Sequence, residues 1–411
     1  MKVIVFGGHG KMGRVVAWDL IRRDEVEQVG LAARCKDALE NVQAWLKSPK
    51  LVLHILDVED RAAVQLLMRN YDVGVSALPD RRCSYLIVDA AAEAGFSMVD
   101  MLEEYHRRPD IYETENIVLP AGMRLEAYGE WLNERAERNG AIILDGFGFA
   151  PGISNITVGE GIRKLDMAES VVARVGGIPS KASAERHPLR YMITWAFAHV
   201  LREYMNKVNI LEDGRVKEVN ALTARERFHF NQLGKDEWLD CAITTGMPSF
   251  IFTRPTLKAF AEKTVRWPGH FDGVDVLKEC GMLDIEPVSV DGQALAPRAV
   301  LLAAIEPRLR SLEGDTDVCV MYNTVVGLKD GIRMRVSYHM WDEADPVTGI
   351  SAMGRVTGFP AAIGAVMIGA GRIKVRGIVP PEDAIYGDDY RWFMSELERH
   401  HIHIVETVEP L

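Results

Sequence analysis

At 411 residues the chain is longer than one hydrophobic core usually supports, so its length predicts two domains. Hydrophobic residues make up 48% and charged residues 26%, which is the composition of a soluble globular protein. The net charge is −11 and no segment is rich in Lys and Arg, which argues against nucleic acid as a partner.

The cysteines and the apolar segments bear on the compartment. The cysteines are scattered and never form a C-x-x-C pair, which argues against a zinc site and a disulfide framework. We expect reduced, buried thiols at Cys35, Cys83, Cys241, Cys280 and Cys319. The sequence begins without a signal-peptide pattern, and nowhere do about 18 apolar residues run without a charge, so we expect a cytoplasmic protein without a membrane span.

The first 100 residues alternate between apolar strand-like runs and helix-like stretches. This alternation with short connections predicts a doubly wound parallel sheet, because parallel neighbours need crossover helices. The expected strands are 3–6, 29–33, 51–56, 73–78 and 97–99, and the expected helices are 11–22, 37–47, 61–69 and 83–94.

The pattern changes after about residue 120. A longer helix, 122–139, leads to a strand at 141–145, and period-two alternation at 171–175 and 317–338 predicts an open mixed sheet with one solvated face. The tail contains two expected helices and a strand, at 359–370, 392–400 and 401–406. We therefore predict a first domain over 1–124, an α+β substrate domain over 125–349, and a tail, 350–411, that returns to complete the first sheet.

A glycine motif follows the first strand. Residues 8–13 fit G-x-G-x-x-G between a strand and a helix, the context in which this motif binds dinucleotides in a Rossmann domain. We expect Gly8 to allow the sharp turn, Gly10 to admit a pyrophosphate and Gly13 to allow close helix packing. A glycine-rich turn without a ligand is the structural alternative. The predicted cofactor loop is Gly7, Gly8, Gly10, Lys11, Met12 and Gly13.

The end of the second strand bears on the choice between NAD and NADP. An acid there would bind the ribose 2′-hydroxyl, but the sequence has Arg34, which can pair with a 2′-phosphate. NADP is therefore slightly favoured over NAD, although Arg34 as an ordinary surface charge is the alternative. We also assign to the cofactor site the residues Asp57, Ala77, Leu78 and Pro79.

Several segments resemble the saccharopine dehydrogenase family. They occur in the family's order over nearly the whole chain, and they are 76–79, 148–155, 176–179, 188–195, 263–270 and 348–361. Within the family, 244–247 and 263–270 are most similar to lysine 6-dehydrogenases. The sequence departs from the family pattern at Ile178, at Trp267, and at Asp80, Arg81 and Arg82.

The resemblance implies oxidation of an amine carbon to an imine, or the reverse, on an amino-acid or diamine substrate with a nicotinamide cofactor. A proton-handling group should then lie at the carboxyl end of the sheet. We predict that this catalytic group is Asp100 or His106. The alternatives are a helix N-cap for Asp100 and an ordinary surface position for His106.

An amino-acid substrate also needs groups that bind its carboxylate. Arg254 and Arg266 lie in segments that correspond to substrate-contacting stretches of the family, and a guanidinium binds a carboxylate through two parallel hydrogen bonds. Tyr191 and Trp195, on an expected helix, are predicted to line the pocket, and Asp80 is assigned to it too. The alternatives are structural salt bridges for the arginines and core packing for the aromatic residues.

Other functions follow less directly from the sequence. Carboxynorspermidine dehydrogenase-type reductive amination and saccharopine reduction are chemically close alternatives, and a non-catalytic dinucleotide-binding sensor or scaffold is an alternative of another class. His400, His401 and His403 lack partners at metal-ligand spacing, so we expect a surface strand and no metal site. The sequence contains no G-x-S-x-G motif, which marks the nucleophile of many hydrolases, so hydrolase chemistry is unsupported. A homodimer is the expected oligomer.

Overall fold

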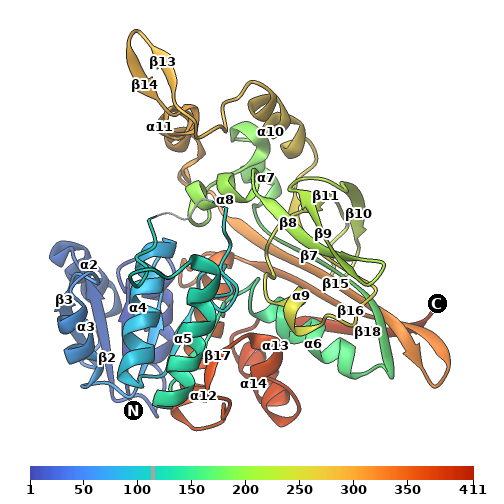
Figure 1. Ribbon diagram of the computed structural model, residues 1–411. Helices are drawn as coiled ribbons and strands as arrows, with labels where there is room; N and C mark the ends of the chain where they lie inside the picture. Colours follow the sequence, from blue (N-terminus) through green and yellow to red (C-terminus); the bar gives the residue numbers. More distant parts are fainter. Residues whose placement is uncertain (113–115) are drawn as a thin grey trace. The chain divides into compact units, whose positions relative to one another are not determined.

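The computed structural model describes residues 1–112 and 116–411, and it divides the chain into two units that are each built from separate segments (Figure 1). Unit 1 comprises 1–164, 247–254 and 354–402. Unit 2 comprises 165–246, 255–353 and 403–411. The chain therefore enters and leaves each unit more than once, and each unit is described by itself.

Unit 1 is built on a seven-stranded sheet in which all neighbouring strands are parallel. The order is β17-β6-β5-β4-β1-β2-β3, so the strand order reverses between β1 and β4. In α/β sheets this reversal is the point beside which ligands bind. The strands are β1 (Lys2–Phe6), β2 (Gln28–Ala33), β3 (Leu51–Ile55), β4 (Val73–Ser76), β5 (Met98–Asp100), β6 (Ile142–Leu144) and β17 (Gly377–Val379).

Helices cover both faces of this sheet. One apolar cluster joins the strands to α3 (Arg61–Met68), α4 (Arg81–Ala94) and α5 (Leu125–Asn139), and these three helices form one layer. The other layer contains α1 (Gly13–Leu20) and α12 (Ala352–Gly369), which approach closely where Gly358 meets Val15. α2 (Lys36–Leu46) connects β2 and β3. The alternating strands and helices of the predicted doubly wound sheet are therefore present.

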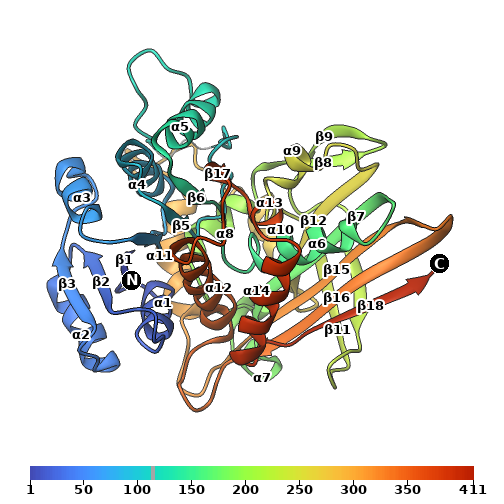
Figure 2. The ribbon, with the colours of Figure 1, turned by 90° about the horizontal axis from the view of Figure 1, so that it is seen from below.

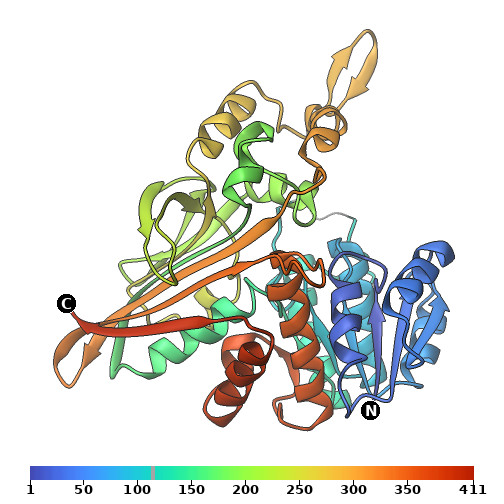
Figure 3. The ribbon, with the colours of Figure 1, turned by 180° about the vertical axis from the view of Figure 1, so that it is seen from behind.

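The helix α12 has the length and apolar composition of a membrane-spanning helix. However, 89% of its 18-residue apolar window is buried inside the structure, as expected of a core helix. It lies beside α14 (Asp388–Arg399) in Figures 2 and 3. Phe147 packs its ring against Phe393 of α14 and approaches Gly364 of α12. The small residues of α12 thus allow tight packing within unit 1.

A buried carboxylate attaches the segment 247–254 to unit 1. Glu382, in α13 (Pro381–Ala384), is completely buried and accepts hydrogen bonds from Ser249 Oγ at 2.7 Å and Thr253 Oγ1 at 2.8 Å. Asn155 Nδ2, at the start of α6 (Ile153–Arg163), donates to the same carboxylate at 2.9 Å. These bonds explain why a segment of the middle of the chain, including α9 (Phe250–Thr253), belongs to unit 1.

Unit 2 is built on a nine-stranded mixed sheet in which β12 and β7 are parallel and the other pairs are antiparallel. The path runs β10-β11-β12-β7-β15-β16-β18, with β8 and β9 attached to β12. Figure 3 shows the C-terminal strand alongside β16. The strands are β7 (Met167–Pro179), β8 (Lys207–Glu212), β9 (Arg215–Asn220), β10 (Glu226–Phe230), β11 (Glu237–Ile243), β12 (Ala259–Arg266), β15 (Asp317–Lys329), β16 (Ile332–Glu343) and β18 (Ile404–Pro410).

Short helices and one hairpin complete unit 2. An apolar cluster packs α8 (Phe197–Glu203), α10 (His270–Glu279) and α11 (Pro297–Leu309) against the sheet residues Ala242 and Ile243. The hairpin of β13 (Val288–Val290) and β14 (Gln293–Leu295) extends away from the rest of the unit in Figures 1 and 3. The remaining helical segments are α7 (Lys181–Ala184) and η1 (Pro188–Arg190).

The divisions found in the structure differ from the predicted boundaries at 124 and 349. Unit 1 continues to residue 164 because β6 and α6 belong to it. The tail does complete the first sheet through β17, but its last strand pairs with β16 in unit 2. The strand expected at 401–406 begins only at Ile404, because His401 has a left-handed backbone with φ of 57°.

The cysteines are all free thiols, but not all of them are buried. Cys241 and Cys319 are buried, whereas Cys35 and Cys280 are exposed and Cys83 is half-buried. The prediction of buried thiols is therefore wrong for Cys35 and Cys280, which lie at the start of α2 and the end of α10.

Candidate functional site

The glycine loop follows β1 at the carboxyl edge of the parallel sheet. Gly7 has a left-handed backbone with φ of 76°, and its N–H donates to Ala32 O at 2.9 Å. A Cβ on Gly7 would lie 2.8 Å from Ala77 O. The sharp turn is therefore made by Gly7, and not by Gly8 as expected. The same contact places two parts of the predicted cofactor site, Gly7 and Ala77, side by side.

The other glycines of the loop have separate tasks. A Cβ on Gly13 would lie 2.4 Å from Gly7 O, so the predicted close packing of α1 requires glycine there. A Cβ on Gly8 would lie 2.8 Å from Leu31 Cδ2, so Gly8 serves packing against β2. The space around Gly10 is more open, since its Cβ would meet Gly7 O alone, at 3.2 Å.

A dinucleotide pyrophosphate fits this loop. Among the described residues no side chain caps the N-terminus of α1; Arg14 and Val15 donate to Gly10 O and Met12 O, so the N–H groups of Met12 and Gly13 are those left for an anion. The space beside Gly10 is compatible with the predicted approach of a phosphate to the main chain. Lys11 and Met12 lie in the same turn before α1, and Leu78 and Pro79 follow Ala77 after β4. These residues can hold the cofactor's phosphates and the adjacent ribose.

Two further residues of the predicted cofactor site lie at the ends of neighbouring strands. Arg34 directly follows β2 and is exposed, and Asp57 lies just after β3 and accepts a hydrogen bond from the Glu59 N–H at 3.1 Å. Because β2 and β3 are parallel neighbours, both residues lie at the carboxyl edge of the sheet. This is the edge at which the adenosine ribose lies in dinucleotide-binding sheets.

Asp100, the last residue of β5, is completely buried and hydrogen-bonded through both oxygens. Ser84 Oγ donates to Oδ2 at 2.9 Å, and the Leu102 N–H donates to Oδ1 at 2.8 Å. No helix begins in 101–112, so Asp100 is not a helix N-cap. Its position is the strand end that the sequence predicted, facing Ser84 of α4.

His106 is also completely buried, so the surface alternative is wrong. Its Nδ1 lies 2.6 Å from Asp145 Oδ1, and its Nε2 lies 2.9 Å from Ser84 Oγ. Burial disfavours the charged ring, but the carboxylates of Asp145, Asp100 and Glu104 outweigh this and raise the pKa of His106 to about 9. Asp100 and His106, the two predicted proton-handling residues, are therefore joined through Ser84.

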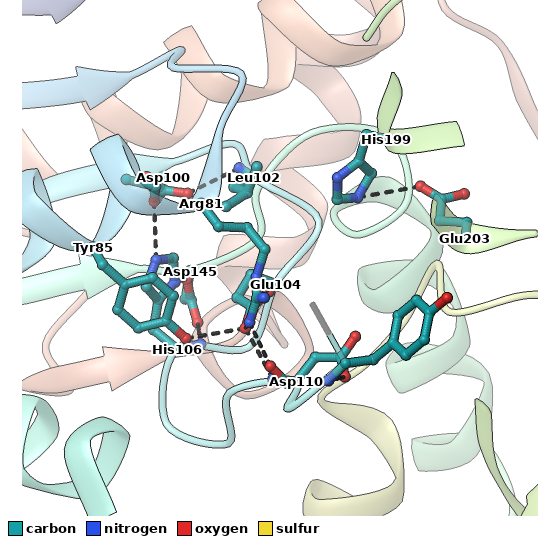
Figure 4. A network of polar contacts seen from close by, with 12 residues as sticks. Arg81, Tyr85, Asp100, Leu102, Glu104, His106, Asp110, Asp145, His199 and Glu203 are labelled. Atoms are coloured by element: carbon teal, nitrogen blue, oxygen red, sulfur yellow. Dashed lines mark hydrogen bonds and ion pairs between the residues drawn. The ribbon is translucent and has the colours of Figure 1, made fainter. Parts of the chain in front are cut away.

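A second buried pair lies in the same network (Figure 4). Arg81, with no exposed surface, binds both oxygens of Glu104, through Nε at 2.7 Å and Nη2 at 2.9 Å. Tyr85 OH and the Asp110 N–H also donate to Glu104. Sequence reasoning noted Arg81 as a departure from the family pattern but found neither this pair nor Ser84 and Asp145.

The carboxylates and imidazole of this network are close enough to hold a metal ion. One ligand atom from each of Asp100, His106 and Asp145 lies within 4.8 Å of the others. However, both ring nitrogens of His106 already face Asp145 and Ser84, and both oxygens of Asp100 accept hydrogen bonds. The geometry is that of a hydrogen-bonded chain from Asp145 to Asp100.

Unit 2 contains a buried arginine, Arg266, at the end of β12. It is 4% exposed and donates from Nε to Tyr204 OH at 2.9 Å and from Nη1 to Val265 O at 2.8 Å. Within the described part of the chain it has no carboxylate at ion-pair distance, and Glu203 acts on it only electrostatically. A buried guanidinium without such a partner retains donors for an anion.

Two buried hydroxyls accompany Arg266 in unit 2. The guanidinium carbon lies 5.4 Å from the ring centre of Tyr191. The Tyr191 OH and Thr194 Oγ1 interact with each other, but within the described residues neither makes a hydrogen bond of 3.5 Å or less. Burial and the Arg266 charge lower the pKa of His270, which contacts Tyr204 OH at 3.0 Å, to about 3, so its ring adds no charge. The predicted residues Arg266 and Tyr191 are thus brought together.

Trp195 is half-buried against the same apolar cluster, with its ring 5.4 Å from His199. The helix expected to carry Tyr191 and Trp195 is absent, because both lie in irregular chain between η1 and α8. Trp195 therefore packs against the apolar cluster, as the alternative interpretation of core packing predicted.

The remaining two predicted substrate residues have local partners in unit 1. Asp80 is the N-cap of α4 and accepts from the Cys83 N–H at 2.8 Å. Arg254 pairs with Asp383 at 2.8 Å and donates to Glu382 O at 3.2 Å. Arg254 thus forms the structural salt bridge that was its alternative, and neither side chain is left without a partner for a substrate carboxylate.

A parallel sheet with a glycine loop beside its reversal point, joined in sequence to a mixed-sheet unit, defines a two-domain dinucleotide-dependent oxidoreductase. Family comparison agrees with this class. The saccharopine dehydrogenase NADP binding domain matches residues 3–140, and the saccharopine dehydrogenase C-terminal domain matches residues 148–402. The chain belongs to the saccharopine dehydrogenase family, and it is an NAD(P)-dependent oxidoreductase.

Individual relatives are distant but match along most of the chain. A carboxyaminopropylagmatine dehydrogenase from Synechocystis sp. is 23% identical over 399 residues, covering 93% of each chain. An NADP-dependent, L-glutamate-forming saccharopine dehydrogenase from Pyricularia oryzae is 22% identical, covering 93% of this chain and 94% of its own. The structure of a saccharopine dehydrogenase from Saccharomyces cerevisiae has the same fold, with a TM-score of 0.76, 18% identity and 99% coverage of both chains.

Proposed function

We propose that the protein uses NADP to oxidise, or NADPH to form, a C–N bond in an amine substrate that carries a carboxylate. The names of its relatives support this chemistry, since both the carboxyaminopropylagmatine and the saccharopine dehydrogenases act on carboxylated amines. A secondary amine that joins two carbon fragments is the substrate class that we favour.

The single observation that supports the carboxylate is Arg266. A guanidinium that is 4% exposed and has no ion-pair partner among the described residues destabilises the free protein unless an anion compensates it. The buried hydroxyls of Tyr191 and Thr194, which interact with each other, offer further donors in unit 2. Together with the planar guanidinium they match the two oxygens of a carboxylate.

We assign proton transfer to the hydrogen-bonded series of side chains Asp145, His106, Ser84 and Asp100. Because its pKa is raised to about 9, His106 carries protons on both nitrogens at neutral pH. Nε2–H then donates to Ser84 Oγ while the Ser84 hydroxyl donates to Asp100 Oδ2. When the proton on Nε2 moves to Ser84 Oγ, the Ser84 proton moves to Asp100, and neutral His106 and protonated Asp100 result.

Side chains of the protein therefore transfer the proton, and the cofactor, when bound, accepts or supplies the hydride. In the reductive direction the substrate nitrogen gains one proton, which Asp100 can supply and regain from charged His106 through Ser84. In the oxidative direction the same path runs backwards and requires neutral His106, which prevails only above the His106 pKa of about 9. Asp100 lies at the carboxyl end of β5, the edge at which ligands bind in α/β sheets.

Preference for NADP over NAD is part of the proposal. Residue 34, where an NAD-binding sheet typically has an acid, is an exposed arginine. The family description of residues 3–140 as an NADP binding domain supports the same preference.

Lysine 6-dehydrogenation is the second candidate function, favoured by the likeness of 244–247 and 263–270 to that group of enzymes. It differs in acting on a primary amine and requires only one amino acid in the site. A non-catalytic sensor would retain the glycine loop, but the buried Arg266, which has no ion-pair partner in the described part of the chain, supports a protein that also takes up a substrate.

A paired substrate screen tests the proposal. Saccharopine, lysine and ornithine are each compared with their decarboxylated analogues, with NADP and NAD and in both directions, by the absorbance of reduced nicotinamide. We expect turnover with the carboxylated substrates, and faster turnover of the secondary amine saccharopine than of lysine. Turnover of each decarboxylated analogue should be at least tenfold lower. Equal turnover of decarboxylated amines would contradict the assignment of Arg266, and turnover of lysine alone would favour the second candidate.

We also infer a cytoplasmic homodimer whose substrates are small molecules. The five free thiols suit a reducing compartment, and the open sheet of unit 2 offers a surface that a two-fold axis can pair. Light scattering of the purified protein measures the mass, and a monomeric mass would contradict the dimer.

A further inference from the structure

Two arginines and one glutamate gather at the carboxyl edge of the unit 1 sheet, close to the end of β2. Arg82 Nη1 donates to Glu59 Oε1 at 2.7 Å, and the Arg34 charge acts on the same carboxylate. We call these three residues the charge cluster. They come from three different elements, since Arg34 follows β2, Glu59 precedes α3 and Arg82 lies in the first turn of α4.

The position of Arg82 is not explained by the stability of its helix. The first turn of a helix is its positive end, so a cation there is unfavourable. Arg82 is the second residue of α4, after the N-cap Asp80, and its side chain stays one-third exposed, whereas the neighbouring Arg81 is buried against Glu104. A partly exposed cation in an unfavourable position at the carboxyl edge of the sheet is typical of an anion-binding residue.

The cluster is also open enough to exchange partners. Glu59 is about half exposed at 49%, and Arg34 is exposed. A surface pair of this kind contributes little to stability, so Arg82 can leave Glu59 at small cost. A phosphate monoester carries nearly two negative charges at neutral pH, against one for Glu59, and it offers three acceptor oxygens.

We propose that Arg82 and Arg34 together bind the 2′-phosphate of NADP, and that Glu59 is the competing anion that limits the preference for NADP over NAD. In the free protein Arg82 forms an ion pair with Glu59. The 2′-phosphate displaces it and contacts both guanidiniums, whereas the 2′-hydroxyl of NAD leaves the Arg82–Glu59 pair intact. This inference rests on the proposed function, and it names residues outside the glycine loop as those that determine cofactor specificity.

Calorimetric titration with 2′,5′-ADP and with 5′-ADP isolates the phosphate from the nicotinamide. We expect Arg82→Gln to weaken 2′,5′-ADP binding by about tenfold or more while leaving 5′-ADP unchanged, with a similar loss for Arg34→Gln. Glu59→Gln should strengthen 2′,5′-ADP binding by a few fold, because it removes the competing anion. The same pattern should appear in the affinity for NADP relative to NAD.

Arg69→Gln is the matched control. Arg69 is an exposed arginine at the C-terminal end of α3, so it removes the same charge near the opposite edge of the sheet and should leave all affinities unchanged. Thermal unfolding of each variant checks that the fold is retained.

The outcomes separate this inference from the function on which it rests. Unchanged 2′,5′-ADP affinity in Arg82→Gln, or weaker binding in Glu59→Gln, would overturn the inference. A wild-type protein that binds NAD and NADP equally would also overturn it and leave the oxidoreductase intact. A protein that binds neither dinucleotide would refute the proposed function itself.

Discussion

Two buried regions of the protein treat charge in opposite ways. In unit 1, Arg81 meets Glu104 at 2.7 Å and His106 meets Asp145 at 2.6 Å, so the buried cations have carboxylate partners. In unit 2, Arg266 is buried to a similar degree, but among the described residues its hydrogen bonds go to Tyr204 OH and Val265 O. A buried cation with a partner holds the chain in place, whereas one without a partner is available to a ligand.

The largest expected effect comes from breaking a pair in unit 1. Glu104→Gln leaves the Arg81 charge buried without its carboxylate, so the free energy of unfolding should fall by about 3–5 kcal/mol in chemical denaturation. Asp275→Asn, which breaks the exposed pair with Arg225, is the control and should cost about 1 kcal/mol or less. Equal decreases of the unfolding free energy in both variants would show that the Arg81–Glu104 pair does not stabilise unit 1.

The next effect depends on pH. Because the pKa of His106 is about 9 in the folded protein and 6.5 in its ordinary state, the charged ring stabilises the fold fully below pH 6.5. This contribution, about 3 kcal/mol, should be lost as pH rises through 9. His106→Gln should remove that slope from the unfolding free energy measured between the two values.

His229→Gln, at a partly exposed histidine of β10 that pairs with the exposed Asp236, is the control for the pH series and should keep the wild-type slope, because such a surface pair contributes little to stability. A His106→Gln protein with the same pH dependence as the wild type would contradict the charged state that we assign to His106, and with it the direction of the proton path.

Removing the unpaired charge of unit 2 should have a smaller effect on the fold. Arg266→Met should change the free energy of unfolding by about 1 kcal/mol or less, or raise it, because no ion pair is broken. The same change should raise KM for a carboxylated substrate on the order of a hundredfold. A loss of stability as large as that of Glu104→Gln, with KM unchanged, would make Arg266 a structural residue.

The smallest effect concerns one hydroxyl. Tyr191→Phe removes a buried OH that, among the described residues, makes no hydrogen bond of 3.5 Å or less and interacts with Thr194, so stability should change little, while substrate affinity should fall by about threefold to tenfold. Tyr204→Phe is the matched comparison, because its OH bridges Arg266 and His270 and its loss should destabilise the fold. If the two variants lose equal stability, the hydroxyl of Tyr191 is not reserved for a ligand.

The glycine loop could be predicted because its requirements are local. Gly13 must be a glycine since its Cβ would meet the main chain of the same turn, and that demand appears in the sequence as a motif after a strand. The exchange of roles between Gly7 and Gly8 was missed because it depends on Ala77, which directly follows β4, and on Leu31 in β2.

The partners of the candidate site could be predicted only in part. Asp100 and His106 were found from the strand end that they follow. Ser84 and Asp145 were not, although Asp145 follows β6 as Asp100 ends β5, which was a usable signal. Since His106 and Asp145 are 39 residues apart, their contact depends on how β5 and β6 pair. Likewise, the isolation of Arg266 from carboxylates is a property of the folded unit.

The most direct test of the account is a calorimetric titration of the purified wild-type protein and of Gly10→Ala with NADPH. A Cβ on Gly10 would lie 3.2 Å from Gly7 O, so the variant should keep its fold after a shift of a few tenths of an ångström and yet obstruct the pyrophosphate. We predict clear binding to the wild type and binding at least tenfold weaker to Gly10→Ala. No binding of NADPH to the wild type, or equal binding to both proteins, would contradict a cofactor seated on the glycine loop.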